Sequence, residues 1–149
     1  MIGINLYKAS PYLLKKINNV CNLLKQGKKE YEQVADTVTD KDLRRTMLSL
    51  AQESNQYACE LSSQIHTLGG IPEIELNNAG IEDEIKNVNG EEEIISLCQK
   101  NEKTMLSAYR EILKESFLYE GLRKMICYQL NEMLFAFTQA KQIGSLKFH

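Results

Sequence analysis

The sequence predicts an all-α protein, a four-helix bundle made of two antiparallel helical hairpins that a long crossover joins. Helix breakers are scarce, with only two Pro and eight Gly in 149 residues. Apolar residues recur at steps of three and four along four segments, which is the spacing of one helix face. One connection, at 69–89, is much longer than the other two, and a bundle needs such a connection when two successive helices run parallel.

The first hairpin is predicted to consist of helices at 11–36 and 40–68. A Ser-Pro pair opens the first helix, since Ser is a good N-cap and Pro suits the first helical position. Thr39, with Asp42 three residues on, gives the second helix a capping-box-like start. The pair at 69–70 is Gly-Gly, which supplies the left-handed backbone that ends many helices.

The second hairpin is predicted to consist of helices at 90–114 and 118–143. Three Glu at 91–93 suit the positive N-terminal end of the first of them. The crossover before it is rich in Asn and Gly, as turns are. We expect the whole chain, residues 1–149, to form one domain.

A polar layer is predicted at the middle of the bundle, because three positions on the inward stripes are polar. These are Ser54, Glu102 and Gln129, and Tyr57 lies on the same stripe as Ser54. A buried carboxylate is costly unless it is hydrogen-bonded or protonated. We therefore expect these four residues to form a hydrogen-bonded layer that fixes helix register more than it adds stability.

The carboxylates and histidines are the residues from which a metal site could be built. The four carboxylates near the middle of their helices are Glu30, Glu53, Glu102 and Glu132. Only Glu102 falls on an inward stripe, so it is the single candidate ligand, and the other three are predicted to be solvated flanking charges. The two histidines, His66 and His149, belong to no Glu-x-x-His motif. The sequence thus predicts no catalytic residue, no metal and no cofactor.

A family resemblance follows from five features in this order along the chain. They are Gly27 to Tyr31, Val38 to Leu43, Leu68 to Pro72, Glu102 seven residues before Tyr109, and Gln129. In these the chain resembles a bacterial group of ferritin-like four-helix bundles of uncharacterised function. The resemblance implies a ferritin-like fold and no particular activity.

The chain is also distantly similar to bacterioferritins and mini-ferritins, whose bundle centre holds metal-binding carboxylates and Glu-x-x-His motifs. Among the positions of those ligands, only Glu102 has a plausible counterpart here. The other ligand positions fall at Leu24, Ser54, Tyr57, Gln129 and Met133. These departures argue against iron oxidation.

Composition and charge narrow the classes of partner. The net charge is −2, with both signs interspersed. The chain is therefore not basic enough to suggest that it binds nucleic acid. No apolar run reaches the ~20 residues of a membrane span. The four cysteines lie far apart, without a Cys-x-x-Cys motif, and no signal peptide is evident, which favours the cytoplasm.

Three functions remain open. The first is a non-catalytic bundle that works by association, as a homo-oligomer with a dimer favoured or with an unidentified protein, for instance in a stress response. Four apolar residues off the main stripes could serve it or could pack beneath the crossover: Phe117, Leu118, Leu134 and Phe135. The alternative is a di-metal, iron-binding oxidoreductase or storage protein. The third is a carrier of a small apolar ligand, lined by Met47, Met105 and Met133.

Overall fold

The computed structural model contains four helices and describes residues 10–70 and 91–147 of the chain. The helices are α1 (Pro11–Thr37), α2 (Lys41–Thr67), α4 (Glu91–Leu113) and α5 (Glu120–Lys147). No strand occurs in these two stretches. The predicted all-α, four-helix class is therefore confirmed. None of the helices in these stretches has the length and apolar character that crossing a membrane requires.

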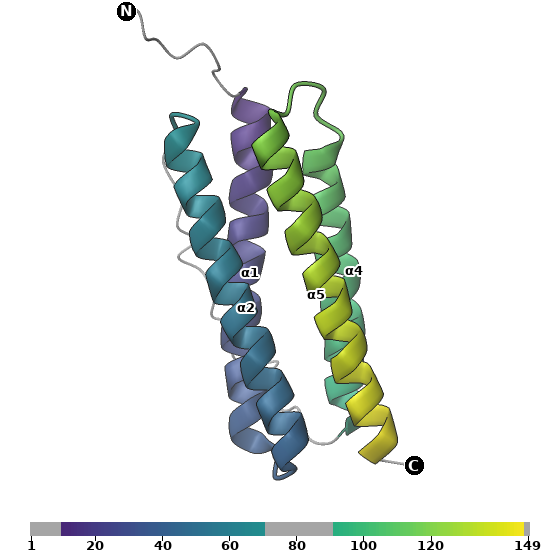
Figure 1. Cartoon of the computed structure of the whole chain (residues 1–149). Helices are drawn as coiled ribbons and strands as arrows, with labels where there is room; N and C mark the ends of the chain where they lie inside the picture. Colours follow the sequence, from purple (N-terminus) through teal and green to yellow (C-terminus); the bar gives the residue numbers. More distant parts are fainter. Residues whose placement is uncertain (1–9, 71–90, 148–149) are drawn as a thin grey trace, which may run out of the picture.

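The helices form two antiparallel hairpins that pack side by side (Figure 1). Helix α1 lies against α2 and α4, and α5 lies against α4 and α2. Lys16 near the start of α1 pairs with Glu115 just beyond α4, at 2.9 Å between Nζ and Oε2. Gln64 near the end of α2 accepts a hydrogen bond from Tyr119 just before α5. Neighbouring helices of the two hairpins are therefore antiparallel, and α2 and α4 run in the same direction, as the prediction of a crossover requires. Most of the predicted crossover lies outside the described residues.

Side chains cap the starts of the first two helices. The Oγ of Ser10 accepts from the backbone N–H of Leu13 at 3.1 Å, and Pro11 follows it, as predicted. At α2 the prediction of Thr39 as the cap is wrong, because Asp40 is the N-cap and its Oδ1 accepts from the N–H of Leu43 at 2.9 Å. A carboxylate there also suits the positive helix end, which a hydroxyl cannot match.

The ends of α1 and α2 are held by different means. Gly69 has φ of 85°, and the N–H of Gly70 donates to the carbonyl of Ile65 at 2.8 Å, which is the predicted left-handed stop. At α1, Arg44 of the next helix donates to the carbonyls of Ala35 and Val38, at 3.1 and 2.8 Å. Arg44 therefore satisfies acceptors that the end of α1 leaves open.

Helix α5 continues past the predicted end at residue 143. Gly144 is buried, and a Cβ atom placed on it would lie 3.1 Å from the side chain of Ile95 on α4. The glycine therefore serves close packing of α5 on α4 here and does not end the helix.

One apolar core fills the space between the four helices. Its largest fully buried side chains include Tyr31, Tyr109 and Phe137, and the rings of Tyr31 and Phe137 meet edge to face at 6.2 Å. Met47, Met105 and Met133 are buried members of the same core. Methionines adapt to irregular gaps, so they complete the packing between the bulkier residues.

Candidate functional site

The structure buries three of the four residues predicted to form the polar layer. Ser54, Tyr57 and Gln129 are buried, at 4% exposure or less. Glu102 is not, since 25% of its side chain is exposed, and both its oxygens accept from Nζ of Lys141, at 2.9 and 3.1 Å. The expectation of a buried Glu102 bonded to Gln129 and Ser54 is therefore wrong. Glu102 lies at the edge of α4 that faces α5, where a lysine can reach it.

The hydrogen bonds around Gln129 join three helices. Its Oε1 accepts from the hydroxyl of Tyr109 on α4 at 2.9 Å. Its Nε2 donates to Oε1 of Glu60 on α2 at 2.9 Å, and also lies 3.5 Å from the carbonyl of Tyr57. Ser54 takes no part, because its hydroxyl donates to the carbonyl of Leu50 in its own helix at 2.8 Å. The polar layer thus exists with Tyr109 and Glu60 in the places expected for Glu102 and Ser54.

A second polar cluster joins α1 to α4. Nδ2 of Asn101 lies 3.0 Å from Oε1 of Glu30 and 3.0 Å from the hydroxyl of Tyr31. Glu30 is only 3% exposed, so its prediction as a solvated flanking charge is wrong. Glu30 is buried because α4 packs over the side of α1 that carries it. Asn101 was not identified from the sequence. It could have been, because Asn101 lies next to Glu102 at the edge of the inward stripe of α4.

The buried tyrosines are held in their protonated form. Burial raises the pKa of Tyr31 and that of Tyr109 above the ordinary value, because a phenolate would lose its water. Both therefore keep a hydroxyl proton to donate, and Tyr109 uses it on Gln129. These tyrosines fix the geometry of the interior and do not titrate near neutral pH.

Carboxylates gather along the outer edge between α2 and α5. Burial, followed by the charge of Glu132, raises the pKa of Glu53. The Oε2 atom of Glu53 is buried and has no hydrogen-bond partner. Beside them the rings of Tyr57 and Tyr128 meet edge to face at 6.4 Å. Glu132 is half-buried, so neither carboxylate is the fully solvated charge that the sequence predicted.

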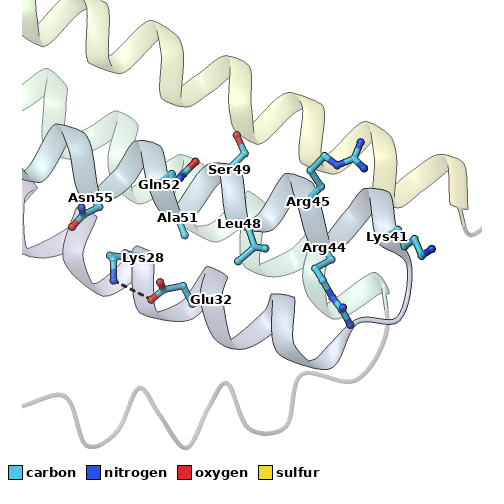
Figure 2. Close-up of a pocket in the computed structure, with 10 residues that line it drawn as sticks. All are labelled: Lys28, Glu32, Lys41, Arg44, Arg45, Leu48, Ser49, Ala51, Gln52 and Asn55. Carbon is cyan, nitrogen blue, oxygen red and sulfur yellow. Dashed lines mark hydrogen bonds and ion pairs between the residues drawn. The ribbon is translucent and has the colours of Figure 1, made fainter.

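A groove of about 910 Å³ lies between α1 and α2 (Figure 2). Four of its lining residues are cationic, namely Lys28, Lys41, Arg44 and Arg45. Its one carboxylate, Glu32, already pairs with Lys28 at 3.1 Å. Leu48, which is 45% exposed, and Ala51 supply an apolar part. This groove combines a cationic rim with a small apolar patch.

The described residues do not assemble a metal site. No group of three or more His, Cys, Asp or Glu in residues 10–70 and 91–147 is arranged to hold a metal ion. His66 is exposed in the last turn of α2, and His149 lies outside the described residues. Of the positions compared above with ferritin ligands, Glu102 is partly exposed and paired with Lys141, and the others are buried: Leu24, Ser54, Tyr57, Gln129 and Met133.

One family model matches the sequence, over residues 13–115, from α1 to just beyond α4. It is described as a domain of unknown function (DUF2383). The chain belongs to the DUF2383 family. The match covers more than half of the chain, and the DUF2383 assignment agrees with the expected membership of a family without an assigned role. A search of curated proteins found no match.

Proposed function

We propose that this DUF2383 protein is a non-catalytic bundle that acts by association, with copies of itself or with a protein partner. The observation that carries this proposal is the contrast between its interior and its surface. The polar side chains around Gln129 and Asn101 bond to one another, whereas large aromatic side chains stand on the outside of the helices.

The interior supports the proposal because it is filled by side chains that already have partners. Gln129 uses both ends of its amide, on Tyr109 and Glu60. Tyr31 and Glu30 share Asn101. A side chain in such a cluster is held in one rotamer, which suits a structural role better than substrate binding.

The surface supports it because aromatic residues are exposed on ordered helices. Tyr128 is 59% and Phe135 60% exposed. They lie about two turns apart, on the same face of α5. Aromatic side chains are enriched at protein interfaces, where they bury much area. Phe117, in the turn between α4 and α5, is a further exposed aromatic residue, at 84%. Leu118 and Leu134 are partly buried and pack against the core.

We further propose that the protein is ferritin-like in descent, resides in the cytoplasm and serves a stress response. The layout of two hairpins with α2 and α4 running in the same direction supports the first point. Cys21, Cys59, Cys98 and Cys127 are all free thiols, which supports a reducing compartment.

The test measures metal content and mass on the same preparation. The purified chain is incubated with ferrous iron in air, desalted and assayed for iron, and its mass is measured by light scattering over a range of concentrations. A concentration-dependent oligomer without bound iron is the expected result. Two irons per chain would overturn the proposal in favour of a di-metal protein, and a monomer that captures no protein partner would overturn it as well.

A further inference from the structure

Charge is distributed along α2 in an order that the helix itself does not favour. Its Lys and Arg residues all lie within the first five positions, at Lys41, Arg44 and Arg45. After Asp42, its acidic residues come later, at Glu53 and Glu60. Cations near a helix N-terminus oppose the helix dipole, which favours anions there. The helix dipole therefore gives no reason for these three cations to lie here.

Contacts among residues 10–70 and 91–147 account for only part of this charge. Arg44 is explained, because it binds the carbonyls at the end of α1. Lys41 and Arg45 form no ion pair with any carboxylate of residues 10–70 and 91–147. Across the same stretches, no cation pairs with Glu53 or Glu132. Within the described stretches, cations without an ion pair thus lie at the start of α2, and carboxylates without one lie further along, at its edge with α5.

The middle of the outer face of α2 is uncharged and exposed. Its residues are Ser49, Gln52, Asn55, Gln56 and Cys59, and Leu48 borders it on the side of α1. Figure 2 shows Arg45, Ser49 and Gln52 projecting from the side of α2 that faces away from α1, whereas Arg44 and Leu48 point toward α1. A neighbouring helix could lie along this middle part without burying an unpaired charge.

We propose that the outer face of α2 is the interface of a two-fold dimer, in which α2 packs antiparallel to α2 of a second copy. The two-fold axis passes between Ser49 and Gln52. Lys41 and Glu60 lie at equal distances on either side of that point, so each faces the other residue type of the second copy. Arg45 comes within about one turn of Glu53 of the second copy, and every such contact occurs twice.

This arrangement is electrostatically favourable at both ends of α2. The cations lie beside carboxylates, and antiparallel packing sets opposite ends of the two helix dipoles together. The pKa of Glu53 is raised by its burial and by Glu132, so an arginine beside it offsets an unfavourable charge. Exposed apolar groups flank the face on both sides, with Leu48 in the groove and Tyr128 and Phe135 on α5.

The proposal rests on the self-association part of the proposed function, and a cysteine placed near the axis tests its geometry. The full chain would carry Gln52→Cys, with the exposed Cys59 and Cys127 replaced by Ser. Residues near a two-fold axis lie close to their own copies, within reach of a disulfide. Under mild oxidation we expect this variant to form a covalent dimer. The matched control, Thr104→Cys on the exposed face of α4, should stay uncrosslinked.

Charge reversal tests the ion pairs by sedimentation. Arg45→Glu places two like charges where the dimer has two attractions, so we expect its dissociation constant to rise about tenfold or more. Lys103→Glu, an exposed reversal on α4, should leave the constant unchanged. The attraction should also weaken with added salt.

The outcomes separate this inference from the proposed function. Cross-linking at position 52 together with a weaker Arg45→Glu dimer would support the α2 interface. A wild-type dimer that neither cross-links at position 52 nor responds to Arg45→Glu would overturn the interface and leave self-association standing. A chain that stays monomeric at every concentration would overturn both the interface and self-association, and would leave association with a protein partner as the proposed function.

Discussion

Replacing Gln129 with Leu should lower the stability of the bundle by about 1–3 kcal/mol, the cost of leaving a buried polar group unpaired. Gln129 is fully buried, and its Oε1 accepts a hydrogen bond from the equally buried hydroxyl of Tyr109 at 2.9 Å. Leu has a similar size and fills the space, so no cavity forms. The destabilisation comes from the Tyr109 hydroxyl, which loses its hydrogen-bond acceptor. Glu60, which also loses a partner, is half-buried and can bind water instead.

The size of the effect on melting follows from the length of the chain. For a domain of this size, 1 kcal/mol corresponds to a shift of about 2–4 °C. A loss near the middle of the range therefore lowers the melting temperature by about 4–8 °C. Far-UV circular dichroism, with heat and with urea, measures both quantities, and an unchanged urea slope would show that the unfolded state is unaltered.

The double variant Gln129→Leu with Tyr109→Phe distinguishes the hydrogen bond from packing. Removing both partners leaves no polar group unpaired, so we expect the double variant to be more stable than Gln129→Leu alone. The coupling energy should be about 0.5–3 kcal/mol. As a control, Gln129→Leu combined with Tyr12→Phe, at an exposed tyrosine, should be additive. Additivity in the first pair would refute our reasoning about the buried cluster.

Three further substitutions probe the other features. Glu102→Leu removes the partly exposed ion pair with Lys141 and should change the free energy of unfolding by less than about 1 kcal/mol in urea titrations, whereas collapse of the fold would contradict this. Glu53 has a raised pKa in the fold, so its ionisation lowers stability as the pH rises through the unfolded value toward the raised one. Glu53→Gln should therefore raise the melting temperature at pH 7 and lose that effect below about pH 4, and an equal effect at both pH values would count against the shift. Gly69→Ala puts a side chain on a residue with φ of 85° and open space around it, so thermal unfolding should show a loss of about 1–2 kcal/mol from backbone strain alone.

The fold could be predicted from the sequence because its signals are local. Steps of three and four between apolar residues predict each helix. The Ser-Pro pair marks the start of α1, and Gly69 marks the end of α2. The observed bounds of the four helices lie within four residues of those predicted. The largest miss was the end of α5. Gly144 was expected to lie beyond that helix. It lies within α5 instead, where the side chain of Ile95 on α4 leaves little room for a larger residue.

The site could not be predicted to the same degree, because the edges of a helix stripe depend on its neighbours. Glu102 and Asn101 lie next to each other on α4, and only the placement of α1 and α5 decides which one turns inward. Asn101 meets α1, and Glu102 reaches Lys141 on α5. Glu30 was assigned to solvent for the same reason, since nothing local to α1 shows that α4 covers it.

The arrangement of two hairpins has a consequence for the order of folding. Each hairpin closes over a short connection, 38–40 or 114–119, so its own contacts are near in sequence. The bond from Gln129 to Glu60, by contrast, joins residues 69 positions apart. Local contacts form with little loss of chain entropy, and distant ones come later. We therefore expect the hairpins to form first and to dock last, so that removing the Gln129–Glu60 bond, for instance with Glu60→Ala, should speed unfolding while hardly changing the rate of folding.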